Sequence, residues 1–261
     1  MRAVYVDLDG TLLGRHGSLL HDGEGAISLL GVRALEACAR AEAEVVIMSG
    51  RRQETVRGPA RLLGQSSYIF EAGSCLVLDG EEQWLTGAFT PGEPSINEQI
   101  AATGAPALLL DAFAGRLEYH DPWHVGREVS HLFRGRVEAA EADALLAQHG
   151  HDTLRLVDNG GLSDHEGMRA YHLVPAMVSK ATAVAAHMRA RGLEPAQCIA
   201  VGDSREDLEV AASVGTFWLV ANALAREPTL LAGAPSNVRV AEGAHGAGVY
   251  EAVVTTLAER A

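Results

Sequence analysis

Short apolar runs alternate along this chain with segments in which apolar residues recur at helical spacing. Residues 4–6 and 45–48 form two such runs, and the stretch 32–39 between them has the helical spacing. The alternation returns late in the chain, with apolar runs at 198–201 and 217–220. Short apolar strands between helices are typical of a parallel sheet that helices cover on both faces. The pattern therefore predicts an α/β fold.

The alternation breaks after a third apolar run, Tyr68–Phe70. Asp79-Gly80 stands between the apolar run Cys75–Leu78 and another at 83–85, which predicts a β-hairpin with a two-residue turn. Outside the middle of the chain, the other expected elements are a short helix interrupted near Gly58-Pro59, helices at Lys180–Arg191, 208–214 and 248–260, and a strand at Val238–Val240.

Residues from about 88 to 173 have a different texture. Expected strands come there in neighbouring pairs rather than between helices, which indicates an α+β insert. We therefore expect a core domain made of residues 1–87 and 174–261, with an inserted domain at 88–173. The expected elements of the insert are an initial helix, strands near 116–119 and 125–133, a helix at 137–148, and strands at 154–157 and 169–173.

Composition narrows the possible partners. The chain has 261 residues, of which 48% are hydrophobic, and a formal net charge of −13. A nucleic-acid partner would favour a basic surface, so we expect none. No apolar run approaches the roughly 20 residues of a membrane span, so we expect no membrane partner either.

Cysteine usage and the start of the chain suggest a location. The three cysteines are widely spaced and form no C-x-x-C pattern, which fits a reducing cytoplasm better than a disulfide framework or a zinc site. The chain enters a strand at once, without a signal peptide. We therefore expect a cytoplasmic protein, as a monomer or a homodimer.

Two carboxylates follow the first apolar run directly. Asp7 and Asp9 are spaced i and i+2, so they emerge on the same face, and Gly10 and Thr11 then turn the chain away. Two carboxylates that close repel each other unless a proton or a cation lies between them. The pair suits a hard, oxygen-preferring metal such as Mg²⁺ and a reaction at a phosphoryl group. An acidic turn after an edge strand would explain only one of them.

Polar residues also follow the other core strands, where ligands of such sheets bind. Ser49 and Gly50 follow the second apolar run and offer a hydroxyl and a close backbone approach to an anion. Asp203 follows the run 198–201, Asp207 lies in the first turn of the next helix, and Lys180 is near the start of its helix. Each alone fits a helix cap or a surface charge. Together, after successive strands, they predict one active site.

At these positions the chain resembles the haloacid dehalogenase (HAD) superfamily of phosphatases. The stretch Asp7-Leu8-Asp9-Gly10-Thr11 is similar to the first motif of that family, and Gly202-Asp203 with Asp207 is similar to the fourth. Ser49 and Lys180 stand where the second and third motifs are expected. The resemblance covers the expected core domain and implies a HAD-like Rossmannoid core with a parallel sheet.

The insert lies between the serine and lysine motifs, which resembles the branch with a C2-type cap. That branch includes Cof-type sugar phosphatases, sucrose phosphatase and mannosyl-3-phosphoglycerate phosphatase. Three stretches are similar to the mannosyl-3-phosphoglycerate group, at 70–73, at 127–130, and at 171–173 followed by 179–180. Ala72 and Glu206 depart from the branch, which commonly has asparagine at both positions.

The resemblance implies a two-step phosphoryl transfer. Asp7 would attack phosphorus and form an aspartyl-phosphate, and Asp9 would protonate the leaving alcohol and then activate water. Mg²⁺ would be the cofactor, and its ligands would be Asp7, the backbone carbonyl of Asp9, Asp203 and Asp207. Together with Lys180, the residues that bind the phosphate oxygens would be Thr11, Ser49 and Gly50.

Substrate choice is expected to depend on the cap. The resemblance favours a phosphorylated sugar or sugar derivative, with a glycosyl-phosphoglycerate as one candidate. Other small phosphomonoesters, such as nucleotide or cofactor phosphates, are the alternative, and a phosphomutase or a non-catalytic phospho-ligand sensor is a weaker one. Candidate substrate contacts are Arg51, Glu71, His124, Asn159 and Arg127, whose charge suits a second anionic group such as a carboxylate.

Overall fold

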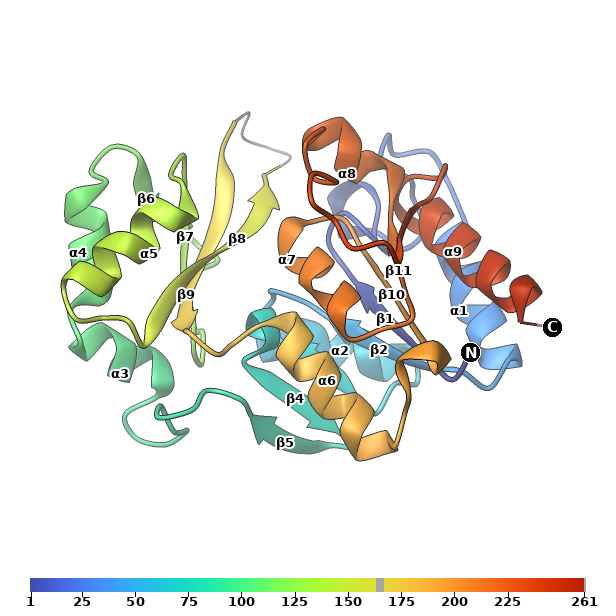
Figure 1. The fold of residues 1–261 in the computed structure, drawn as a ribbon, viewed down its shortest axis with the longest axis horizontal. Helices are drawn as coiled ribbons and strands as arrows, with labels where there is room; N and C mark the ends of the chain where they lie inside the picture. Colours follow the sequence, from blue (N-terminus) through green and yellow to red (C-terminus); the bar gives the residue numbers. More distant parts are fainter. Residues whose placement is uncertain (163–166, 261) are drawn as a thin grey trace.

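The computed structural model describes residues 1–162 and 167–260, and its larger part is an eight-stranded sheet with helices on both faces (Figure 1). The strands from β12 to β3 are parallel, and β4 and β5 add an antiparallel hairpin at one edge. In spatial order the strands are β12 (Val238–Val240), β11 (Thr216–Leu219), β10 (Cys198–Gly202), β1 (Ala3–Asp7), β2 (Glu44–Met48), β3 (Tyr68–Phe70), β4 (Cys75–Leu78) and β5 (Glu81–Trp84).

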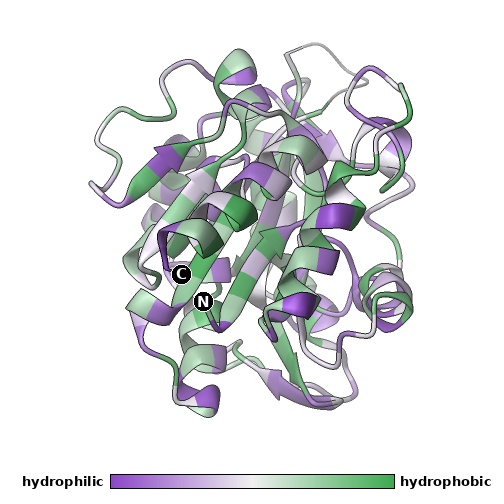
Figure 2. Ribbon diagram, turned by 90° about the vertical axis from the view of Figure 1, so that its right-hand side faces the viewer, coloured by the Kyte–Doolittle hydropathy of each residue, from purple (hydrophilic) through white to green (hydrophobic). Residues whose placement is uncertain are grey.

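The central strand β1 is buried on both of its faces. Val4 and Val6 pack into one apolar cluster, which includes residues of α1 and α9, while Ala3 and Tyr5 pack into a second cluster with residues of α6. Figure 2 shows this apolar centre, with hydrophilic residues on the surrounding helices and loops. The predicted α/β fold is therefore confirmed. The helices around this sheet are α1 (Leu30–Arg40), α2 (Gln53–Leu62), α6 (Lys180–Arg191), α7 (Arg205–Leu208), α8 (Ala221–Arg226) and α9 (His245–Glu259).

The predicted hairpin is present and has the turn that its sequence indicates. Asp79 and Gly80 have φ values of 52° and 90°, so both turn residues adopt the left-handed backbone of a two-residue hairpin turn. Trp84, at the end of the hairpin, packs against the apolar cluster of the core and that of the inserted domain. The hairpin thus leads the chain from the core into the insert.

The inserted cap is a second, four-stranded antiparallel sheet with its own apolar cluster. Its three helices lie on the side away from the core, and β8 and β9 lie towards it (Figure 1). Its strands in spatial order are β6 (Leu117–Tyr119), β7 (His131–Gly135), β9 (Arg169–Pro175) and β8 (Leu154–Gly161), and its helices are α3 (Ile96–Ala102), α4 (Ala105–Ala112) and α5 (Ala139–Gln148).

Several expected elements differ in the structure. The strand predicted at 125–133 begins only at His131, because the backbone N–H groups of residues 128–130 donate to the carboxylate of Glu71 instead of a neighbouring strand. Helix α2 continues through Pro59, and burial of Val56 and Ala60 compensates for the lost hydrogen bond.

Three short helices were also wrongly placed or missed. The helix expected at 208–214 begins as α7 at Arg205, and its second half is a 3-10 turn at Glu209–Ala212. The cap begins with the two helices α3 and α4 rather than one, and α8 was not predicted. Helices of six to eight residues contain too few turns for a clear apolar period. Among the described residues, we find no helix with the length and apolarity needed to cross a membrane.

Candidate active site

Lys180 lies at the centre of a buried cluster at the carboxyl ends of β1 and β10. Its Nζ donates hydrogen bonds of 2.8 Å to Oδ1 of Asp7 and 2.7 Å to Oδ1 of Asp207, and its side chain is only 1% exposed. The side chain of Ser179 caps α6 by accepting a hydrogen bond from the N–H of Thr182, which places Lys180 at the first position of the helix. Asp7 and Asp207, which are far apart in the sequence, therefore meet at one ammonium group.

The approach of α6 to the sheet depends on a glycine. The short 3-10 turn Glu71–Gly73 lies against the start of α6, and a Cβ at Gly73 would lie 2.1 Å from the carbonyl oxygen of Ser179. Gly73 also has a φ of 96°, in the region that other residues avoid. This position accepts only glycine if Lys180 is to reach the cluster.

Asp207 is held firmly by the loop that precedes α7. Its Oδ2 accepts hydrogen bonds from the N–H and hydroxyl of Ser204 and from the N–H of Asp203, at 3.1, 2.7 and 3.2 Å. With Lys180 on Oδ1, both carboxylate oxygens are engaged. Asp207 is thus placed to anchor Lys180 and the loop, while direct metal contact would depend on the remaining lone pair of Oδ1.

The carboxylates of Asp7, Asp203 and Asp207 suit a hard divalent cation. Each offers an oxygen, and the three oxygens lie within 4.8 Å of one another. Four buried carboxylates, these three and Glu206, face two cations, Lys180 and Arg226. Burial and the neighbouring Asp207 raise the pKa of Asp203 to about 6, although Arg226 opposes the shift. The local excess of negative charge matches an ion such as Mg²⁺, which would bind through Asp7 and Asp203.

Asp9 is not one of the clustered carboxylates and forms a bidentate pair with Arg51. The guanidinium donates from Nε and Nη2 at 2.6 and 2.5 Å, and the Asp9 side chain is 56% exposed. Arg51, which we expected to contact substrate, therefore lies on the predicted acid. Hydrogen bonding to Asp9, partly offset by burial, raises the pKa of Arg51. The pair lies at the exposed edge of the site.

Ser49 and Gly50 follow β2 as the motif predicts. The buried Ser49 hydroxyl oxygen accepts the N–H of Arg51 at 3.2 Å, which leaves its proton available for an anion. A Cβ at Gly50 would lie 3.0 Å from both Asn159 Nδ2 and His172 Nε2, so β8 and β9 of the cap approach this loop closely. Gly50 is therefore a point of contact between core and cap.

Thr11 contacts a carboxylate of the cluster. We expected it to bind phosphate, but its buried hydroxyl donates to Oδ1 of Asp203 at 3.1 Å. The turn that follows Asp9 thus orients a carboxylate of the acidic cluster. This hydrogen bond therefore joins the first motif, which contains Thr11, to the fourth motif, which contains Asp203.

Glu206, which stands where the related branch commonly has asparagine, is fully inside the cluster. Its carboxylate lies 3.6 Å from Lys180 Nζ, is 1% exposed, and has no hydrogen-bond partner among the described residues. Burial raises its pKa to about 7, although Lys180 opposes the shift. Burial lowers the pKa of Lys180, but Asp207, Asp7 and Glu206 outweigh it, so the net pKa is well above the ordinary value.

Glu71 fastens the cap to the core and is not directed at a substrate. Its buried carboxylate accepts the N–H groups of Glu128, Val129 and Ser130 and the hydroxyl of Ser130, at 2.8, 3.1, 2.7 and 2.9 Å. These four hydrogen bonds occupy both oxygens. Its expected role as a substrate contact is therefore not supported by its position.

A proton count at Ser130 fixes the tautomer of a buried histidine. The Ser130 hydroxyl donates its one proton to Glu71 and accepts from Arg127 Nη1 at 3.0 Å, so His172 Nδ1, 3.1 Å away, must donate to it. Burial, with Arg127 and Lys180 nearby, lowers the pKa of His172 well below its ordinary value. Its Nε2 therefore faces the Gly50 loop as a neutral acceptor.

The other cap candidates divide into two groups. Arg127 donates from Nη1 to the carbonyl of Gly50 at 3.0 Å and from Nε to the carbonyl of Trp123 at 3.1 Å. With Asn159 it lies against the Gly50 loop, although its direct partners are uncharged oxygens. His124 instead stacks on Tyr119 within the cap, with ring centroids 4.9 Å apart.

Some residues of the site were not predicted from the sequence, because tertiary packing brings them there. Arg226, at the end of the unpredicted α8, pairs with Asp203 at 2.7 Å, and Asn222 of the same helix donates to the carbonyl of Gly10 at 2.8 Å. His172 lay in a stretch that matched the related branch, but no local pattern assigned it a role. One signal was present for Lys180, because it is the single lysine of a chain with 21 basic residues.

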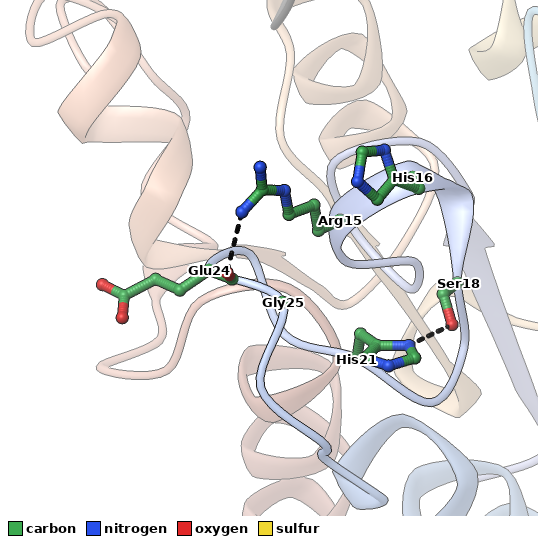
Figure 3. A pocket seen from close by; sticks show the side chains of 6 residues that line it. All are labelled: Arg15, His16, Ser18, His21, Glu24 and Gly25. Carbon is green, nitrogen blue, oxygen red and sulfur yellow. Dashed lines mark hydrogen bonds between the residues drawn. The ribbon is translucent and has the colours of Figure 1, made fainter.

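A separate pocket of about 310 Å³ lies in the loop after β1, as Figure 3 shows. Its side chains mainly hold the loop together, since Arg15 donates to the carbonyl of Glu24 at 3.2 Å and Ser18 Oγ lies 2.8 Å from His21 Nδ1. None of the residues predicted for the site lines this pocket. We therefore assign the chemistry to the carboxylate cluster.

Known proteins are similar to this chain in sequence and in fold. No family model matches the chain. Phosphoglycolate phosphatase of Methanoculleus marisnigri is 28% identical over 256 residues, which are 97% of this chain and 95% of that protein. The structure of sucrose-phosphatase from Synechocystis, in complex with sucrose and phosphate, covers 98% of both chains with a TM-score of 0.66 and 18% identity.

A haloacid dehalogenase-like hydrolase from B. subtilis covers 97% of this chain and 99% of that chain, with a TM-score of 0.63 and 17% identity. These structures share the core and the inserted cap, and the cap leaves the core between Ser49 and Lys180. The chain therefore has the fold of these haloacid dehalogenase-like hydrolases, inserted cap included, and is similar in sequence to phosphatases.

Proposed function

We propose that this protein is a Mg²⁺-dependent phosphatase for a small phosphomonoester that carries a second acid group, with phosphoglycolate as the first candidate. The observation that supports the reaction is the buried cluster in which Lys180 bridges Asp7 and Asp207 beside Asp203. The name of the Methanoculleus relative, which aligns over nearly the whole chain, supports the substrate.

The structure of Asp7 suits a nucleophile. Lys180 holds Oδ1, and no described residue donates a hydrogen bond to Oδ2, so this oxygen is free to attack phosphorus and form an aspartyl-phosphate. A divalent cation at the cluster would neutralise charge between this carboxylate and the phosphate. Ser49 and Lys180 would hold the oxygens that are not transferred and stabilise the charge that develops on them.

Asp9 would serve as acid and then as base. Its bidentate partner Arg51 must release it when a phosphate dianion enters, and the guanidinium is then free for the phosphate oxygens. Asp9 would donate a proton to the leaving alcohol and afterwards take one from the water that hydrolyses the aspartyl-phosphate. Asp9 thus acts at the open side of the site, opposite the buried Lys180.

The cap, with proposed boundaries at 88 and 173, would select the substrate. Arg127 and Asn159 lie against the Gly50 loop, and the guanidinium of Arg127 has no carboxylate among its hydrogen-bond partners in the described residues. A cation of this kind favours an anionic substrate. A phosphorylated sugar or a glycosyl-phosphoglycerate is the alternative substrate class.

A substrate panel tests this proposal. Purified protein would be assayed for release of inorganic phosphate from phosphoglycolate, phosphoglycerate, sugar phosphates and nucleoside monophosphates, with Mg²⁺ and with a chelator. We expect kcat/KM to be highest for an acid-bearing small ester and activity to vanish with the chelator. Preference for a sugar phosphate would contradict the proposed substrate and support the alternative class. Absence of turnover across the panel would favour a non-catalytic phospho-ligand sensor.

A further inference from the structure

Arg226 forms an ion pair with a buried carboxylate of the proposed metal cluster. Its Nη2 lies 2.7 Å from Oδ2 of Asp203, whose side chain is only 6% exposed. The other oxygen of Asp203 accepts the hydroxyl proton of Thr11 at 3.1 Å. Both oxygens of Asp203 are therefore engaged, and one of them has a cationic partner.

The packing of α8 fixes this pair in place. Asn222 donates to the carbonyl of Gly10 at 2.8 Å and accepts the N–H of His245 at 2.9 Å, which ties the helix to the first motif. A Cβ at Gly10 would lie 2.3 Å from Asp203 Oδ2 and 2.8 Å from Arg226 Nη2. The turn after Asp9 is thus shaped to leave room for the pair, and Arg226 is not a casual surface contact.

A guanidinium and a divalent ion compete for the same carboxylate. If Mg²⁺ binds Asp203 as we propose above, two positive charges face one carboxylate, and like charges at such short range repel each other. Arg226 is 41% exposed, so it has room to leave, whereas Asp203 does not. Metal binding should therefore displace the guanidinium from Asp203.

The displaced guanidinium faces a pocket of about 240 Å³ between core and cap, which both Asp203 and Arg226 line. The other cation of its lining, Arg169, is already neutralised, since it donates to Asp158 at 2.5 Å and to Glu227 at 3.0 Å. Among the described residues, Asp203 is the only carboxylate that pairs with Arg226. Once released, Arg226 would leave an unpaired positive charge in a pocket beside the metal site.

We propose that Arg226 is an internal counter-cation of Asp203, that Mg²⁺ replaces it there, and that it then binds the carboxylate of the substrate in this pocket. The inference rests on the proposed function, because it uses the same metal site and an acid-bearing substrate. It adds a residue and a subsite for the second acid group. It also couples metal binding to substrate binding, because the same guanidinium takes part in both.

The first test measures metal binding without substrate. Chelator-treated protein would be titrated with Mg²⁺ in a calorimeter, as wild type and as Arg226→Gln, Arg226→Lys and Arg205→Gln. Removing a competing charge should tighten Mg²⁺ binding roughly fivefold in Arg226→Gln, with a smaller change in Arg226→Lys. Arg205→Gln is the matched control, since Arg205 pairs with Glu227 and not with Asp203, and its affinity should stay within about twofold of wild type.

The second test separates the carboxylate contact from the phosphate site. KM would be measured at saturating Mg²⁺ for phosphoglycolate and for 2-hydroxyethyl phosphate, which has a hydroxymethyl group in place of the carboxylate. We expect KM of Arg226→Gln to rise about tenfold or more for phosphoglycolate and to stay within about twofold for the neutral analogue.

The outcomes distinguish the two proposals. Unchanged or weaker Mg²⁺ binding in Arg226→Gln, while Arg205→Gln equals wild type, would overturn the competition at Asp203. An equal rise of KM for both esters would overturn the carboxylate contact. A wild-type protein that binds Mg²⁺ but hydrolyses no ester would contradict the proposed function while the calorimetric result still stands. A wild type that binds no Mg²⁺ would contradict both.

Discussion

The Nζ of Lys180 donates a hydrogen bond of 2.8 Å to Oδ1 of Asp7, although 173 positions of sequence separate the two residues. Both side chains are buried, and Asp207 and Glu206 complete the surroundings of the ammonium group. The contact leaves the second oxygen of Asp7 free to react. The charge of this one lysine also stabilises carboxylates that are far apart in the sequence, at Asp7 and at residues 206 and 207.

The single lysine allows this charge to be observed directly. Because its carboxylate neighbours outweigh the effect of burial, the pKa of Lys180 should lie well above its ordinary value. Protein labelled with 13C-lysine gives one side-chain signal, and we expect that signal to show a charged ammonium up to pH 10.5 and beyond. A raised pKa means that this stabilisation persists through neutral pH and is lost only as the pH rises through the folded-state value. Titration at or below the ordinary lysine pKa would contradict the arrangement.

Glu206 should make the protein without divalent ion less stable as the pH rises. Its pKa of about 7 in the folded state exceeds the ordinary value near 4.5, so the folded state binds the proton more tightly and stability falls between these two pH values. Glu206→Gln removes this loss. In a chelator, the free energy of unfolding of the variant should gain up to about 3 kcal/mol over wild type between pH 5 and pH 8. A difference that is independent of pH would show that Glu206 is ionised at no cost.

Gly73→Ala should damage both stability and catalysis. The added Cβ would lie 2.1 Å from the carbonyl of Ser179, at a backbone φ of 96°, and would push the start of α6 and Lys180 away. We expect a loss of more than about 2 kcal/mol and a lower kcat. Gly64→Ala is the matched control, because Gly64 has a φ of 72° but no atom within 4 Å of the added Cβ. Equal effects of the two substitutions would contradict the packing argument.

Glu71→Gln should loosen the attachment of the cap. An amide in place of the carboxylate presents N–H groups to the donors of residues 128–130, so at least one hydrogen bond is lost in a buried place. We expect faster hydrogen exchange at those backbone amides and unchanged exchange in α9. Glu81→Gln, on the exposed strand β5, provides the control. Unchanged exchange at residues 128–130 would mean that other contacts hold the cap.

Residues in short, fixed motifs were predictable from the sequence, and residues brought in by packing were not. Asp7, Ser49 and Asp203 directly follow apolar strands, so parallel pairing alone brings them to one edge of the sheet. The hairpin at Asp79-Gly80 was predictable from its two turn residues, which both adopt a positive φ. Short stretches of sequence are therefore enough to predict such features.

The positions of Glu71 and Arg226 depend instead on distant segments. Glu71 is satisfied by backbone amides some 60 positions later in the chain, and Arg226 meets Asp203 only because α8 docks on the first motif. Thr11 shows the same limitation within a motif, since its hydroxyl is directed to Asp203 by the fold of the fourth motif. Side-chain partners of this kind follow from tertiary packing and leave no period or spacing in the sequence.

The most direct test of the account is the phosphatase activity of wild type against Asp7→Asn. Inorganic phosphate released from phosphoglycolate would be measured at saturating Mg²⁺, with Asp111→Asn, an exposed position on α4, as the control for a change of the same kind. We expect Asp7→Asn to lower kcat by at least about 10³-fold, because the nucleophile is lost, and Asp111→Asn to equal wild type. Substantial turnover by a folded Asp7→Asn protein would show that Asp7 does not attack phosphorus.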